Sequence, residues 1–110
     1  TTIGQWHAEQ VAHLALALDA LPSSNGRTVL DDTLIVWSNE LATGQHGLDD
    51  IPVTLVGGAA GRLRPAGGLV DSGPQTYHRL GCTMLGLMGA PSAGFGEEPA
   101  CGVLQGLTLS

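Results

Sequence analysis

Carboxylate and imidazole side chains gather in one polar segment that lies between two apolar runs. Glu40 and His46 are six residues apart across a segment that contains glycine, and Asp49 and Asp50 follow shortly after. Carboxylate oxygens and imidazole nitrogens together suit zinc, manganese or iron. The segment therefore predicts Glu40 and His46 as ligands of a divalent metal such as zinc. The alternatives are a helix cap or an arginine partner for Glu40 and a solvated position for His46.

No catalytic residue can be assigned from the other reactive side chains. His7 and His13 are six apart on a predicted helix, so they do not share a face as paired zinc ligands do. A cysteine inside an apolar helix, as Cys82 is, is usually inert. Cys82 and Cys101 are either a disulfide or two buried thiols. The glycine run 57–61 lacks the spacing of a nucleotide-binding loop, so it predicts a tight strand exit and no organic cofactor.

Charge and hydropathy exclude two classes of partner. Four Lys and Arg stand against ten Asp and Glu in 110 residues, a net charge of −6 without a basic stripe, so nucleic-acid binding is not expected. No apolar run approaches the roughly 18 residues that span a bilayer, so membrane insertion is not expected either. The chain begins Thr1-Thr2-Ile3 without a methionine, which suggests a processed, truncated or partial product.

Two helices are expected to flank the polar segment. Residues 4–21 carry a stripe of His7, Val11, Leu14, Leu18 and Leu21 at spacings of four and three, and this stripe predicts a wide buried face. Residues 75–88 show a similar apolar face and end at glycine and proline stop signals.

The strands around the polar segment set the predicted fold. Residues 33–37 and 52–58 are continuous apolar runs, as in central strands that are covered on both faces of a parallel sheet. Residues 61–64 and 68–70 could pair as a short hairpin. The order predicts an α/β fold: a partial or small three-layer α/β sandwich with a mainly parallel sheet and helices on both faces. Ligands bind at the carboxyl ends of such strands, so residues 33–58 are the expected functional unit.

Two full strands are few for a sheet, which typically has about four to six. We therefore expect residues 1–110 to be a single α/β domain that is the C-terminal segment of a larger domain.

Two blocks of sequence carry a family resemblance. The stretch LDDTLIVWSNELATGQH (Leu30 to His46) and the stretch IPVTLVGGAAGRLRPAGG (Ile51 to Gly68) resemble the C-terminal portion of the DUF1552 family, which are secreted bacterial proteins of unassigned function. That family looks distantly similar to the alkaline phosphatase-like or sulfatase-like superfamily. The resemblance implies a periplasmic or extracellular protein. It also implies that Asn39-Glu40 stands where the superfamily often has an Asp-His metal pair, with His46 as the downstream ligand.

The resemblance implies one function, and the residues leave others open. The implied function is that of the C-terminal segment of an exported alkaline phosphatase-like protein that hydrolyses phosphate or sulfate esters with a metal. The alternative is a non-catalytic secreted binding or structural domain that retains the superfamily fold. The expected partner is the remaining portion of the same protein or another chain, and an exposed apolar face would be its sign.

Overall fold

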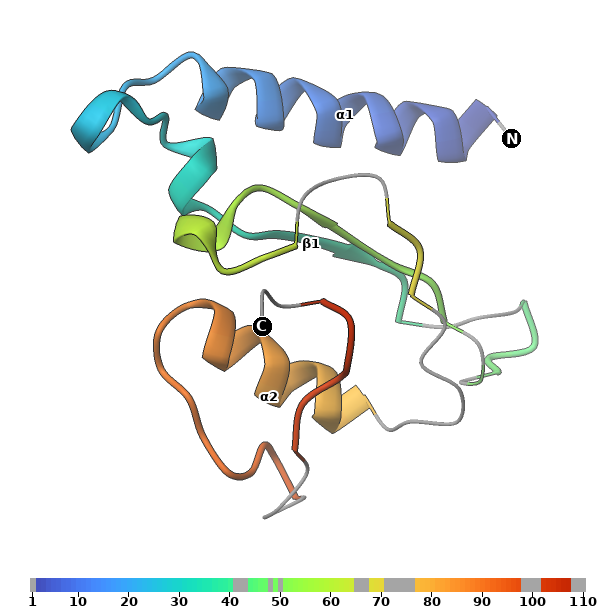
Figure 1. The fold of residues 1–110 in the computed structure, drawn as a ribbon. Helices are drawn as coiled ribbons and strands as arrows, with labels where there is room; N and C mark the ends of the chain where they lie inside the picture. Colours follow the sequence, from blue (N-terminus) through green and yellow to red (C-terminus); the bar gives the residue numbers. More distant parts are fainter. Residues whose placement is uncertain are drawn as a thin grey trace. The chain divides into compact units, whose positions relative to one another are not determined.

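The computed structural model describes residues 2–40, 44–47, 49, 51–64, 68–70, 77–97 and 102–107. The chain divides into two compact units, residues 1–57 and residues 58–110. The first unit holds helix α1 (Thr2–Asp19) and strands β1 (Ile35–Ser38) and β2 (Val53–Val56), and the second holds helix α2 (Tyr77–Leu87), as Figure 1 shows. Short 3-10 turns η1 (Ser24–Gly26), η2 (Leu30–Asp32) and η3 (Ala59–Gly61) lie between these elements.

The sheet differs from the prediction in direction and in size. Strands β1 and β2 pair antiparallel, with Ile35 opposite Val56 and Ser38 opposite Val53. The predicted three-layer α/β sandwich with a mainly parallel sheet is therefore wrong: the described residues contain two helices and one two-stranded antiparallel sheet. A parallel pair needs a crossover, usually a helix, between its strands. Residues 39–52 are polar and contain no helix among their described residues, so the chain turns back on itself instead.

The two strands are also less covered than their apolar composition predicts. No residue of β1 or β2 is buried, and in each strand the second residue is exposed while the other three are half-buried. Val36 retains 39% of its side-chain surface in contact with solvent. A strand with apolar residues on both sides therefore lies in a sheet that covers neither face fully.

Helix α1 confirms the predicted helix but not its predicted buried face. None of its 18 residues is buried, and only Val11, Ala15 and Leu18 are half-buried. The predicted stripe included His7 and Leu14, which are both exposed. Residues 11, 15 and 18 form a row at spacings of four and three, so the helix turns this narrower row inward.

After α1 the chain reverses in a tight turn that the sequence encodes. Asn25 and Gly26 both have positive φ, 58° and 75°, which is the backbone of a type I′ turn. The Arg27 N–H donates to the Ser24 carbonyl across this turn, at 3.2 Å. Pro22 and Thr28 then form an antiparallel bridge. The turn brings the chain back toward the end of α1 before β1 begins.

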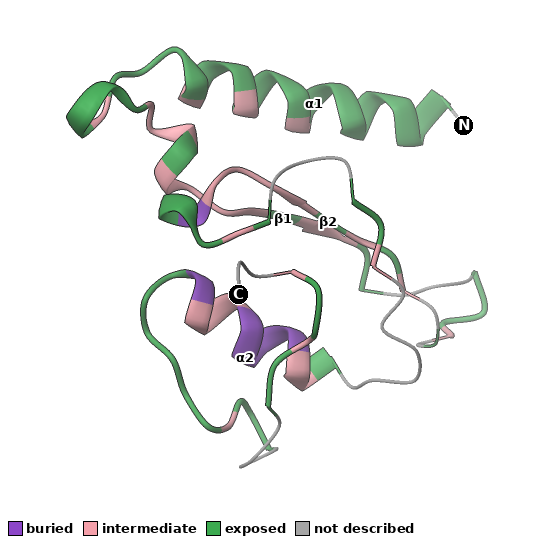
Figure 2. Ribbon diagram, viewed as in Figure 1, coloured by how far each residue is buried: buried purple, intermediate pink, exposed green. Residues whose placement is uncertain are grey.

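The buried side chains of the second unit lie mainly on α2. Leu80, Cys82, Thr83 and Leu87 are each less than a tenth exposed, and Figure 2 shows this buried surface along the helix. The helix ends in a Schellman motif: the Ala90 N–H donates to the carbonyl of residue 85, and Gly89 has a φ of 80°. The predicted second helix is thus confirmed over its described residues, and residues 75 and 76 lie outside them.

Arginine side chains fasten the second unit at two places. Arg62 Nη1 donates to the carbonyl of Leu87, at 3.1 Å, so a cation lies at the C-terminus of α2, where the helix dipole favours it. Arg64 donates its backbone N–H to Leu107 and its Nη1 to Gly106. The described residues of the predicted hairpin, 61–64 and 68–70, form no strand, and Arg64 pairs with the C-terminal segment instead.

Candidate functional site

The polar contacts at the start of β1 begin with a small capping box. The Thr28 N–H donates to Asp31 Oδ2 at 2.8 Å, and the Asp31 N–H donates to Thr28 Oγ1 at 3.4 Å. This reciprocal pair satisfies the first N–H groups of η2, which otherwise have no partner inside the turn. The Thr28 hydroxyl also donates to Asp19 Oδ1 at 2.9 Å, so the capping box is tied to the end of α1.

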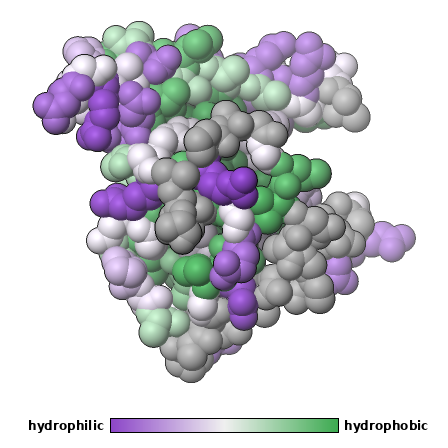
Figure 3. Space-filling model, viewed as in Figure 1, coloured by the Kyte–Doolittle hydropathy of each residue, from purple (hydrophilic) through white to green (hydrophobic). Residues whose placement is uncertain are grey.

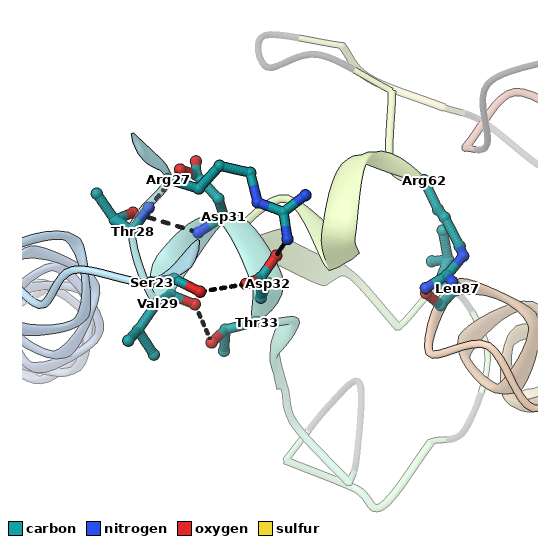
Figure 4. A network of polar contacts seen from close by, with 9 residues as sticks. All are labelled: Ser23, Arg27, Thr28, Val29, Asp31, Asp32, Thr33, Arg62 and Leu87. Carbon is teal, nitrogen blue, oxygen red and sulfur yellow. Dashed lines mark hydrogen bonds and ion pairs between the residues drawn. The ribbon is translucent and has the colours of Figure 1, made fainter. Parts of the chain in front are cut away.

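Asp32 is the centre of the same network (Figure 4). Its Oδ2 accepts a hydrogen bond from the Ser23 hydroxyl at 2.7 Å, and its Oδ1 forms an ion pair with Arg27 Nη2 at 2.8 Å. The Oδ1 atom is buried and has no hydrogen bond with good angles, so its contact with Arg27 is one of charge rather than of direction. Thr33 Oγ1 donates to the Val29 carbonyl at 2.6 Å and holds the exit of η2.

The network fixes where β1 begins, because it holds the turn that immediately precedes the strand. Its carboxylates are occupied by hydroxyl, amide and guanidinium donors that belong to the chain itself. The sequence analysis missed it, although Thr28 and Asp31 stand at the spacing of a capping box, which is a readable signal.

The two predicted metal ligands lie in the polar segment between the strands. Glu40 and His46 are both described and both exposed. His46 has a φ of 65°, the left-handed conformation that histidine adopts more readily than most residues. Asp49 is exposed as well, and Asp50 lies outside the described residues.

Over the described part of the chain, no three His, Cys, Asp or Glu side chains come together in a way that could hold a metal ion. That finding leaves Glu40 and His46 as a pair whose further ligands are unidentified. Zinc binding by these two residues stays a prediction.

The histidines of α1 and the cysteines have structural surroundings. His7 Nδ1 lies 3.0 Å from the Ile3 carbonyl, and the His7 ring meets the Trp6 ring edge to face at 5.3 Å. Cys82 is disulfide-bonded and 1% exposed, which decides between the two readings of the cysteines in favour of the disulfide. The other cysteine of the sequence, Cys101, lies outside the described residues.

The largest feature of the first unit's surface is apolar. Large side chains of α1 are open to solvent: Ile3 by 72%, Leu16 by 70%, Trp6 by 55% and Leu14 by 47%. We call these four side chains the α1 apolar surface. Figure 3 shows hydrophobic side chains on the visible surface of this helix. Solitary exposed apolar residues are ordinary on protein surfaces, but four on one helix that buries none of its residues are not.

Comparison with known proteins identifies no relative: no family model matches the chain, and neither does any curated protein or solved structure. Among the described residues, no helix has the length and the hydropathy that crossing a lipid bilayer requires.

Proposed function

We propose that the chain is a non-catalytic binding or structural domain of an exported protein of the DUF1552 type. Its α1 apolar surface contacts another polypeptide, which is the remaining portion of the same protein or another chain. The observation that carries the proposal is that α1, 18 residues long and rich in apolar side chains, buries none of its residues. A helix that is apolar around most of its circumference normally lies in the core of a larger assembly.

The rest of the first unit supports the same proposal. No described residue between 2 and 57 is buried, whereas the second unit buries side chains on α2 and at Ala59. Burial of apolar surface is the dominant favourable term in folding, at about 25 cal/mol per Å². A unit with apolar strands, an apolar helix and no buried residue gains that term most readily by adding surface from another polypeptide.

Export is supported by the cysteine chemistry. Disulfides persist in the periplasm and outside the cell and are rare in the cytosol. Cys82 is disulfide-bonded, and no described cysteine is free. The disulfide thus agrees with the periplasmic or extracellular location that the family resemblance implies.

Site-specific photo-crosslinking in the producing cells tests the proposed contact. A photoreactive residue at Leu16 or Ile3 should give a covalent adduct with a polypeptide that mass spectrometry identifies. The matched control is the same residue at Gln45, which is exposed but polar and far from α1 in the sequence. Adducts that form equally from Gln45, or from none of these positions, would refute the proposal.

The hydrolase reading is tested separately on the purified protein. We expect no turnover of aryl phosphate or aryl sulfate esters, with or without added zinc. Turnover that is lost in His46→Ala and in Glu40→Gln would replace the non-catalytic proposal with the metal-dependent one.

A further inference from the structure

Strand β1 presents a free edge in the described part of the chain. Only β2 pairs with it there, and alternate residues of an antiparallel strand direct their backbone N–H and C=O groups away from the partner strand. Unpaired backbone groups on an edge are a template for another strand. The edge of β1 therefore selects an extended polypeptide rather than a helix.

The edge of β1 lacks the features by which sheets usually block such pairing. Ile35, Val36 and Trp37 are apolar and favour strands, and no Pro, Gly, Lys or bulge interrupts them. The edge of β2 is shorter in use, because Pro52 precedes the strand and Gly57 follows it with a φ of 112°. Of the two edges, β1 is the better acceptor.

Charge at the two ends of β1 indicates what the added strand carries. Asp31 precedes the strand, Glu40 follows it, and both are exposed. The unit to which they belong, residues 1–57, has one arginine and seven Asp and Glu, which is a net charge of −6. An added strand with basic residues at its ends would meet opposite charge at both ends of β1.

We propose that β1 is a strand-addition site for an extended apolar segment of another polypeptide, flanked by lysine or arginine. A second copy of this chain fits less well, because an antiparallel pair of β1 strands would bring Asp31 of one copy toward Glu40 of the other. The proposal rests on the proposed function, which it deepens by naming the kind of segment that the domain binds. It involves β1 and not the α1 apolar surface.

A designed peptide provides the test. Valine alternates with threonine between terminal lysines, over a length that spans Asp31 to Glu40, and a matched peptide carries terminal glutamates instead. Calorimetry on the full chain measures binding of each. We expect the lysine-flanked peptide to bind about fivefold or more tightly than the glutamate-flanked one, since two exposed ion pairs are gained and two repulsions avoided. Glu40→Gln with Asp31→Asn should remove this preference.

Backbone methylation of the peptide tests the mode of binding. N-methylation of one alternate set of peptide amides should abolish binding, while methylation of the other set should leave the affinity within about twofold, because only one set faces β1. Amide hydrogen exchange of residues 35–37 should slow at alternate positions when the peptide binds.

Three results would overturn the proposal: no binding by either peptide, equal binding of the lysine and glutamate peptides, or equal effects of methylation in the two sets. Any of these results together with crosslinks from Leu16 would leave the proposed function intact and reject only the strand-addition site. Loss of the Leu16 crosslinks with retained peptide binding would do the reverse.

Discussion

Replacing Gly57 by alanine probes the junction between β2 and the turn that precedes β1. Gly57 has a φ of 112°, and a Cβ added there would clash with the Thr33 carbonyl oxygen. It would also lie 3.0 Å from the Thr33 carbonyl carbon and 3.2 Å from the Leu30 carbonyl oxygen. The atoms that it meets are backbone atoms, so relief requires the strand exit or η2 to move.

The expected cost of Gly57→Ala is large and separable into two parts. A left-handed backbone costs an L-residue about 1–2 kcal/mol. Displacing backbone in a packed junction adds about 1–3 kcal/mol, as overpacking does in cores. We therefore expect a loss of about 2–5 kcal/mol in the free energy of unfolding.

Two glycines of the same unit serve as controls. Gly26 has a φ of 75° but no atom within 4 Å of an added Cβ, so Gly26→Ala should show the conformational part alone, about 1–2 kcal/mol. Gly44 has neither constraint, so Gly44→Ala should change stability by less than about 0.5 kcal/mol.

Urea unfolding followed by tryptophan fluorescence is the assay, because Trp6 and Trp37 are the only two tryptophans and both belong to residues 1–57. A Gly57→Ala protein that is as stable as Gly26→Ala would show that Gly57 does not approach Thr33, and the arrangement of β1, β2 and η2 would then be wrong.

Three further predictions concern the second unit. Gly81→Ala should destabilise by about 1–2 kcal/mol despite the higher helix propensity of alanine, because the added Cβ would lie 2.5 Å from the Phe95 ring; Phe95→Ala in the same protein should remove the clash, and thermal unfolding followed by helical circular dichroism measures both. Thr83→Val should cost about 1–3 kcal/mol, because the buried hydroxyl donates to Arg79 and accepts from the Leu104 N–H, whereas Thr83→Ser should retain both bonds in the same assay; equal losses would contradict this role. Reduction of the Cys82 disulfide should lower stability by about 3 kcal/mol in urea unfolding with and without dithiothreitol, and an unchanged midpoint would refute a stabilising role.

Local signals in the sequence predict the elements better than their assembly. The helix that ends at Asp19 and the helix that ends at Leu87 follow from apolar spacing and from the stop signals at Pro22 and Gly89. The Asn25-Gly26 pair and the Thr28 to Asp31 capping box were equally legible, since each encodes its own backbone geometry within four residues. Such features depend on neighbours in the chain, which the sequence displays directly.

Strand direction could not be predicted from the same evidence. An apolar run such as residues 33–37 has the same composition in a parallel strand and in an antiparallel one. What decides is the connection, and residues 39–52 are long enough for a crossover but lack the apolar periodicity of a crossover helix. The polar segment was instead interpreted as a metal site, and this interpretation drew the argument toward a parallel sheet whose edge would hold ligands.

The buried face of α1 is where the sequence and the structure disagree in a way that one pair of variants can decide. The apolar spacing treats Leu14 and Leu18 alike, but Leu18 is half-buried and Leu14 is 47% exposed. The same Leu→Ala change at both positions leaves helix propensity nearly matched, so the difference reports on packing. In the isolated chain Leu18→Ala should lower the free energy of unfolding by about 1–2 kcal/mol, and Leu14→Ala by less than about 0.5 kcal/mol. Tryptophan fluorescence in urea measures both. Equal losses would mean that Leu14 packs inside the unit, and the α1 apolar surface could then not be the contact through which the domain binds its partner.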